Sequence, residues 1–246
     1  MKAVITYHSI DPSGSVISVD EATFAAHMAW LAANVAVLPL RELLDSPCES
    51  AVALTFDDGF QNFADAALPH LVKFNLPATV FVTTDLVGKT NEWSLGPPPA
   101  VPHLPLMDWH VLESVRKHGI TIGSHTRTHP NLKHTADQMH TEIAGSADII
   151  ARRLGNRPQE FSYPYGNYDE TVVAAARATY AIACTTELRA ISPQTDPLRM
   201  PRLDAYYFRR PGLLERFGSA AFRRFIWVRR NGRAVRRALV ADGGRG

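Results

Sequence analysis

The sequence predicts an α/β fold in which the strands of a mainly parallel sheet, open or closed into a barrel, alternate with helices. Two observations carry this prediction. Short apolar runs alternate along the chain with longer segments of helical periodicity. The short runs are also apolar at nearly every position, as expected of strands whose two faces are both covered by other elements.

Seven segments have the length and composition of buried strands. They are Ala3–Tyr7, Val35–Leu38, Ala51–Phe56, Ala78–Thr83, Ile120–Gly123, Glu160–Tyr163 and Tyr180–Cys184. Five segments with helical spacing lie between them: one that begins at the N-cap candidate Asp20, then Phe63–Phe74, Trp109–Lys117, Ala136–Leu154 and Glu170–Ala178. The stretch Asn91–Pro105 is rich in Pro and Gly, which predicts an irregular loop that could border a cleft.

Composition indicates an ordinary globular protein, with 46% hydrophobic and 20% charged residues and a length sufficient for a full core. No apolar run approaches the roughly 20 residues that span a bilayer, and the N-terminus lacks the features of a signal peptide. Cys48 and Cys184 have no metal-binding spacing and are predicted to be reduced thiols. We therefore expect a cytoplasmic protein.

Charge is distributed unevenly along the chain. Residues 209–246 hold eleven Arg, no Lys and two acidic residues, a net +9, whereas the whole chain is +2 and the first 208 residues are therefore −7. This contrast divides the chain into a body, residues 1–208, and a basic Arg-rich C-terminal extension, residues 209–246. An acidic body with a basic end suggests that the extension has an anionic partner.

Residues 211–228 of the extension are predicted to form an amphipathic helix. One helical face carries Leu214, Phe217, Ala221, Phe225 and Val228, and the opposite face carries Arg216, Arg223 and Arg230. Such a helix either packs on the body or binds an anionic membrane surface, where each basic residue contributes about 1 kcal/mol. The second alternative would place the protein peripherally at the inner face of the membrane. Nucleic acid is not an expected partner.

Polar residues directly follow several of the predicted strands. They are His8, Asp57 with Asp58, His125 with His129, Tyr165, and Arg202 with Asp204. In parallel α/β folds, the loops that leave the carboxyl ends of the strands carry the chemistry. We therefore expect these side chains to converge on one rim of the sheet.

The pair Asp57–Asp58 is the first part of a predicted metal site. Adjacent carboxylates repel each other unless a cation neutralises one, although an isolated Asp-Asp-Gly is more often a helix cap or turn. His125 and His129, four residues apart after another strand, can reach a single ion. Two histidines and one carboxylate with an open position form a known catalytic Zn²⁺ arrangement. One aspartate could bind the metal while the other takes a proton from water, which suits hydrolysis of an unactivated amide.

Three segments carry a family resemblance. TFDDG at 55–59, SHTRTHP at 124–130 and FSYPYG at 161–166 resemble the first three motifs of the polysaccharide deacetylase (NodB-homology) family, carbohydrate esterase family 4. That family includes chitin, peptidoglycan and poly-N-acetylglucosamine deacetylases. The resemblance implies a distorted (β/α) barrel of about seven parallel strands over residues 1–208. It also implies hydrolysis of N-acetyl groups on a sugar, polysaccharide or glycolipid precursor, as in exopolysaccharide biosynthesis.

The resemblance also implies roles for individual residues. Asp57 would be the general base, and the backbone N–H of Tyr165 would support the oxyanion that forms at the acetyl carbon. The ligands of one divalent metal ion would be Asp58, His125 and His129, with Zn²⁺ expected first and Co²⁺, Ni²⁺ or Mn²⁺ as alternatives. Tyr163 and Leu132 are candidate substrate contacts; Leu132 would either line a pocket for the acetyl methyl group or pack in the core.

In two places the sequence departs from the family pattern. Many members have an Arg in the third motif that orients the base aspartate, whereas this chain has Ser162. Arg202 could compensate by approaching Asp57, with Asp204 holding a partner in place, although an ordinary ion pair is an equal alternative for Arg202. Members also usually have a late histidine that protonates the leaving amine, and this chain has no histidine after His140.

His8 is the candidate substitute for the missing acid. Tyr-His after the first strand is similar to the branch of biofilm poly-N-acetylglucosamine deacetylases, in which the acid comes from the N-terminal strand. The alternative is a buried histidine that bonds to the backbone. The histidines within helical patterns, His27 among them, are predicted to lie at the surface.

Three functional hypotheses follow from these residues. The first is a metal-dependent sugar N-deacetylase that releases acetate. The second keeps the site but places a non-sugar or cyclic amide in it, since the family resemblance extends to such enzymes. The third is a carbohydrate-binding relative without catalysis. Metal content and acetate release would separate the three.

Overall fold

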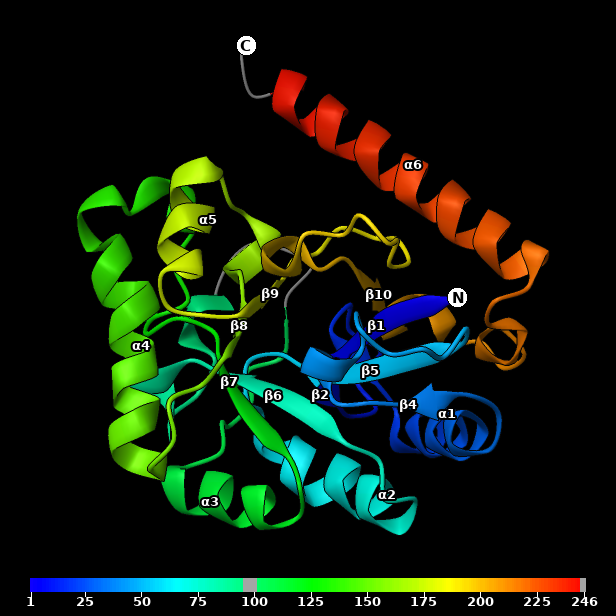
Figure 1. The fold of residues 1–246 in the computed structure, drawn as a ribbon, viewed down its shortest axis with the longest axis horizontal. Coiled ribbons are helices and arrows are strands. Elements are labelled where there is room, and N and C mark those ends of the chain that lie inside the picture. Colours follow the sequence, from blue (N-terminus) through cyan, green and yellow to red (C-terminus); the bar gives the residue numbers. More distant parts are fainter. Residues whose placement is uncertain (95–100, 244–246) are drawn as a thin grey trace.

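The computed structural model describes residues 1–94 and 101–243 and confirms a nearly closed barrel of parallel strands surrounded by helices (Figure 1). The part of the predicted loop Asn91–Pro105 that covers residues 95–100 lies outside the described residues. The sheet order is β10-β1-β5-β6-β7-β8-β9, with β4 beside β5. The strands are β1 Lys2–Tyr7, β4 Ala36–Val37, β5 Ala51–Phe56, β6 Ala78–Val82, β7 Thr121–Ser124, β8 Glu160–Ser162, β9 Ile182–Cys184 and β10 Arg202–Asp204.

The barrel is brought close to closure by the residues that lead into β10. Met200 forms a parallel bridge with Cys184 of β9, and its N–H donates to the Ala183 carbonyl at 2.8 Å. Two residues later the chain enters β10, which pairs with β1 in register Val4–Arg202. Strand β10 is absent from the sequence prediction because its three residues include an Arg and an Asp and form no apolar run.

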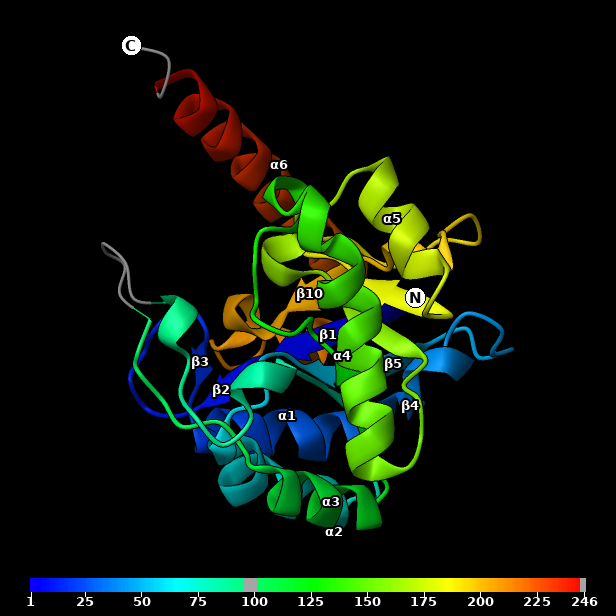
Figure 2. The ribbon, with the colours of Figure 1, turned by 90° about the vertical axis from the view of Figure 1, so that its left-hand side faces the viewer.

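The helices lie outside the sheet (Figures 1 and 2). They are α1 Glu21–Asn34, α2 Leu68–Lys73, α3 Trp109–Lys117, α4 Met139–Leu154, α5 Glu170–Arg177 and α6 Ala220–Gly243. The predicted start of α1 is confirmed, since the Asp20 carboxylate accepts from the Thr23 N–H at 2.9 Å. The predicted helix Phe63–Phe74 is divided, with a π-helical turn at Phe63–Ala67 before α2. A small second sheet pairs β2 Ser9–Ile10 with β3 Ser18–Val19.

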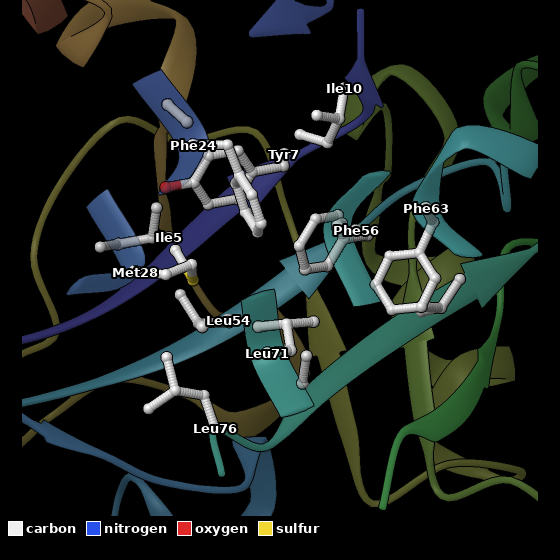
Figure 3. Packing of buried hydrophobic residues seen from close by; sticks show 14 of the residues in the cluster. Ile5, Tyr7, Ile10, Phe24, Met28, Leu54, Phe56, Phe63, Leu71 and Leu76 are labelled. Carbon is white, nitrogen blue, oxygen red and sulfur yellow. The ribbon is translucent and has the colours of Figure 1, made fainter. Parts of the chain in front are cut away.

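Side chains of the strands alternate between the barrel interior and the surrounding helices. Tyr7 of β1 and Phe56 of β5 point outwards, stack with ring centroids 5.3 Å apart, and meet Phe24 of α1 edge-on (Figure 3). The next residues along the chain are His8 and Asp57. Their backbone positions are therefore fixed by the packing of the strand residues directly before them. This alternation is what directs the functional side chains towards the barrel mouth.

His27 is buried, so the prediction that it lies at the surface is wrong. Its Nδ1 lies 3.0 Å from the Tyr7 hydroxyl, and its Nε2 lies 3.2 Å from the Phe208 carbonyl. Burial lowers the pKa of His27, so the ring is neutral at pH 7 and links α1, β1 and the end of the body. Helical spacing placed His27 correctly on α1 but could not show that the C-terminal part of the chain covers it.

The C-terminal helix begins later than predicted and buries a different face. Gly218 adopts a φ of +78°, which ends the preceding turn, and α6 starts only at Ala220. Within α6, Phe222 and Ile226 are buried and Val228 is exposed. The predicted single face from Leu214 to Val228 is therefore wrong, because Leu214 lies in a separate turn before the helix, whereas a helix in the extension is present. Among the described residues, no helix combines the length and apolar character needed to cross a bilayer.

Candidate active site

The polar residues that follow the strands meet in one cleft at the carboxyl ends of the sheet. Its volume is about 370 Å³, within the usual range of ligand pockets. The lining residues are His8, Ile17, Asp57, Asp58, Asn91, Trp93, Val101, His125, His129, Tyr163, Tyr165 and Thr186. The predicted convergence on one rim is thus present for His8, both aspartates, both histidines and Tyr165. Asn91, Trp93 and Val101 come from the stretch Asn91–Pro105, which was predicted to border a cleft, whereas Ile17 and Thr186 enter from loops that the sequence did not assign to it.

Asp58, His125 and His129 form a three-ligand cluster at the base of this cleft. Asp58 Oδ1 lies 3.5 Å from Nε2 of His125 and 3.5 Å from Nε2 of His129. Three ligands that bind one Zn²⁺ tetrahedrally at about 2.0–2.1 Å must be about 3.4 Å apart. The two Asp58–His separations are close to that requirement, and all three ligand atoms lie within 4.8 Å of one another.

The protonation states of the cluster also suit a cation. His125 Nδ1 lies 2.7 Å from the Ser162 carbonyl, which can only accept, so the proton is on Nδ1 and the Nε2 lone pair faces Asp58. Burial lowers the pKa of His129 and keeps it neutral. Asp58 Oδ1 is buried and has no hydrogen-bond partner among the described residues. A buried carboxylate oxygen without a hydrogen-bond donor, 3.5 Å from the Nε2 atoms of two histidines, is a favourable place for a cation.

Strained backbone accompanies this cluster. In the described chain, five residues other than glycine have positive φ, and four of them are Asp58 (73°), Thr126 (68°), His129 (62°) and Tyr165 (58°). Such conformations cost about 1–3 kcal/mol each and persist only where the surroundings fix them. Their concentration here indicates that the surrounding structure is organised to aim these particular side chains.

The loop that carries the two histidines is held from outside the cleft by Glu142 of α4. The buried Glu142 carboxylate accepts from the N–H groups of Arg127 and Thr128 at 2.9 and 3.0 Å, and from the Thr128 hydroxyl at 2.7 Å. The Arg127 side chain in turn pairs with Asp85 at 2.7 Å. The loop conformation is thus fixed on both sides by carboxylates that do not enter the cleft.

Asp57 is bound by Arg202 through two parallel hydrogen bonds. Arg202 Nη1 donates to Oδ1 and Nη2 donates to Oδ2, each at 2.6 Å, and Nη2 also donates to the Ser162 hydroxyl at 3.1 Å. Burial would raise the pKa of Asp57, but the charge of Arg202 lowers it well below its usual range. Arg202 is itself only 2% exposed, so the structure places it as a buried partner of Asp57 and not as a surface ion pair.

His8 directly follows β1 and lines the cleft beside Asp57. Its Nε2 is 3.7 Å from Asp57 Oδ2, and its side chain is 23% exposed. Asp204 accepts from the Tyr206 N–H at 3.0 Å, and burial raises its pKa. Asp204 thus caps the turn Ala205–Phe208 after β10.

Tyr165 stands in a tight turn beside His129. The hydrogen bonds of this turn run from Gly166 N–H to the Tyr163 carbonyl and from Asn167 N–H to the Pro164 carbonyl, so neither uses the Tyr165 N–H. The Tyr165 ring meets the His129 ring edge-on at 4.6 Å. Gly166 has a φ of +66°, and a Cβ there would lie 2.1 Å from the Thr186 hydroxyl, so the turn requires glycine.

Most of the side-chain surface of the two candidate substrate contacts is buried and out of reach of a substrate. Leu132 is fully buried among Ile143, Ala147 and Phe161 and does not line the cleft, which favours the core-packing alternative. Tyr163 borders the cleft but is also fully buried, and its hydroxyl donates to the Leu198 carbonyl at 3.0 Å. Trp93 was not singled out as a site residue but lies in the loop that was predicted to border a cleft; its ring stacks on that of His129 at 4.7 Å and is partly exposed.

A family model described as polysaccharide deacetylase matches residues 45–181, a range that includes all three motifs. Among curated proteins, the chain is 33% identical over 198 residues to YxkH of Bacillus subtilis, described as a candidate polysaccharide deacetylase. It is 26% identical over 203 residues to a poly-beta-1,6-N-acetyl-D-glucosamine N-deacetylase of Staphylococcus epidermidis. These matches cover 77% and 76% of this chain, and 66% and 67% of the two relatives, or about two thirds of their length.

Solved structures share the fold. IcaB from Ammonifex degensii aligns with a TM-score of 0.74 at 20% identity, over 90% of this chain and 97% of that one. The Streptococcus pyogenes deacetylase PplD, solved in complex with acetate, aligns with a TM-score of 0.71 at 24% identity, over 82% of this chain and 91% of that one. At these identities the similarity establishes the barrel architecture and nothing about the substrate.

Proposed function

The chain belongs to the polysaccharide deacetylase family, and we propose that it is a metal-dependent hydrolase that removes N-acetyl groups from an N-acetylated sugar polymer or glycolipid precursor. One observation carries this proposal: the Asp58 oxygen without a hydrogen-bond donor faces the Nε2 atoms of two histidines, directly beside an arginine-bound carboxylate. A purely structural cluster would have no need to leave a buried carboxylate oxygen without a donor.

Asp58, His125 and His129 would hold the metal, with Zn²⁺ expected first and Co²⁺, Ni²⁺ or Mn²⁺ as alternatives. When bound, such an ion polarises the acetyl carbonyl and lowers the pKa of a water from about 15.7 towards about 7. Three protein ligands leave a position open for water or substrate, as in catalytic zinc sites.

Asp57 would accept a proton from the attacking water. Arg202 keeps Asp57 ionised and fixes the orientation of its carboxylate. The same charge makes Asp57 a weak base, so it can take a proton efficiently only from a water that is unusually acidic. The proposed base Asp57 and the proposed metal ligand Asp58 are thus adjacent in sequence, but Asp57 pairs with Arg202 and Asp58 faces the two histidines.

The remaining roles fall to groups on either side of Asp57. The Tyr165 N–H would donate to the oxyanion that forms at the acetyl carbon. His8, 3.7 Å from Asp57 and open to the cleft, would give a proton to the leaving amine, with Asp204 positioning it electrostatically. The partly exposed rings of Trp93 and Tyr165 would offer flat surfaces to a sugar.

The substrate that we propose first is β-1,6-linked N-acetylglucosamine, since a relative matched over most of this chain is named for that polymer. The test measures acetate release by the metal-loaded protein from β-1,6-linked N-acetylglucosamine oligomers, chitooligosaccharides and an N-acetylated amino acid. Release from a sugar supports the proposal. Release from the amino acid alone would favour the non-sugar amide alternative, and tight sugar binding without release would favour a binding protein.

Two variants test the site assignments in the same assay. Asp57→Asn should reduce turnover by several orders of magnitude and still retain the metal. His125→Ala should lose the metal together with the activity, because it removes one of three ligands. Metal loss in Asp57→Asn, or retention in His125→Ala with full activity, would contradict the assignment.

A further inference from the structure

One face of helix α6 is buried against the barrel, so the opposite face points away from the barrel. Phe222 is 2% and Ile226 is 7% exposed, and the Phe222 ring stacks on Phe208 with centroids 5.4 Å apart. The Arg229 guanidinium lies over the Tyr207 ring at 5.7 Å. The contacts of the side chains up to Arg233 thus fix the first part of the helix on the body, and Figures 1 and 2 both show the rest of its backbone extending away from the barrel.

The outward face displays apolar side chains among arginines. Trp227 is 64% exposed and Val228 is 52% exposed. Arg223 and Arg224 precede Trp227 by four and three residues, so they are its neighbours on the helix surface. An exposed tryptophan flanked by basic side chains on one helical face is typical of helices that lie in a membrane interface.

The positive charge of this face is not neutralised within the described chain. Between residues 209 and 233, the ion pairs of the described side chains include only Arg230 with Glu187, at 3.1 Å. Several arginines of the body do have such a partner: Arg127 and Arg177, for example, each pair with an aspartate. The extension carries +9 and the body −7, so the molecule has a strong charge asymmetry that would orient α6 towards an anionic surface.

We propose that the outward face of α6 docks on the surface of an anionic lipid bilayer, with Trp227 at the level of the headgroups and Arg223 and Arg224 on lipid phosphates. Val228 favours a bilayer over a nucleic acid, because the boundary between headgroups and acyl chains buries an apolar side chain that a sugar–phosphate backbone leaves in water. The docking does not depend on the proposed catalytic activity and can be measured without it.

The test is sedimentation of the full chain with vesicles of phosphatidylcholine, with and without phosphatidylglycerol, at low salt. The test variant is Arg223→Gln/Arg224→Gln, and the matched control is Arg152→Gln/Arg153→Gln, an adjacent exposed pair on α4. Both variants remove the same charge, so a difference between them reports on the surface and not on net charge. Point variants are preferable to truncation, since removal of α6 would uncover Phe208.

The protein should bind the anionic vesicles and not the zwitterionic ones. The α6 pair should weaken binding about 25-fold, at about fivefold for each arginine near an anionic surface, and the α4 pair should have little effect. Trp227→Ser should weaken binding without changing its salt dependence. Equal losses in the two arginine variants, absence of vesicle binding, or binding to a DNA duplex in place of vesicles would each overturn the proposal.

Discussion

Replacement of Glu142 tests whether this α4 residue holds in place the loop that carries the two histidines of the metal site (the metal loop). In Glu142→Ala, the N–H groups of Arg127 and Thr128 and the Thr128 hydroxyl lose their acceptor inside the protein. Hydrogen bonds to a charged group contribute about 1.5–3 kcal/mol each. The strain at Thr126 and His129 is of the same order, about 1–3 kcal/mol per residue, so the loop should relax once these bonds are gone.

The expected result is a loss of about 10–100-fold in Zn²⁺ affinity, the usual cost of removing a residue that orients metal ligands. Glu142→Gln should lose less than tenfold, because its amide oxygen can still accept from the two N–H groups. Glu113→Ala, an exposed glutamate on α3, is the matched control. Affinity is measured by competition with a fluorescent chelator, and the melting temperature of the metal-free chain is measured alongside. If Glu142→Ala bound Zn²⁺ as tightly as Glu113→Ala, the reasoning about the loop would be refuted.

Three further variants address the chemistry. Arg202→Met leaves the buried Asp57 carboxylate uncompensated and should lower the free energy of unfolding by about 3–5 kcal/mol. Because Arg202 lowers the pKa of Asp57 and the carboxylate is the active form, the acidic limb of kcat/KM should also move to higher pH; an unmoved limb would argue against Asp57 as base. His8→Ala should reduce kcat about 10²–10⁴-fold with metal content unchanged, and near-normal turnover would remove His8 as the acid. Gly166→Ala should displace the turn that carries the Tyr165 N–H. It should therefore reduce kcat for acetate release about 10²–10³-fold, the usual effect of losing one oxyanion donor.

The positions of most site residues could be predicted because they follow strands whose apolar runs are easy to recognise. His8, Asp57 and His125 each come directly after a buried strand, and parallel strands bring their carboxyl ends to one rim. The pairing of Arg202 with Asp57 was left open between two alternatives. Only the register of β10 against β1 places the Arg202 side chain in the barrel interior.

Other features depend on contacts between distant segments that no local pattern records. Trp93 contacts His129 from a loop, and Glu142 binds the metal loop from a helix. The helical spacing of residues shows which face is buried but not which segment covers that face. His27 was expected at the surface because the part of the chain that buries it, around Phe208, lies 181 residues away. The predicted face of the C-terminal helix combined residues on both sides of Gly218, whose positive φ separates the turn Leu214–Arg216 from α6.

The most direct test of a metal-dependent deacetylase measures acetate release from N-acetylglucosamine oligomers while the metal-free chain is titrated with Zn²⁺. Acetate release should rise with the metal bound and stop rising at one ion per chain, since Asp58, His125 and His129 form a single cluster. Each acetate should be matched by one free amine on the sugar. Full activity in the metal-free chain, or no acetate at full occupancy with any N-acetylated sugar, would contradict the account.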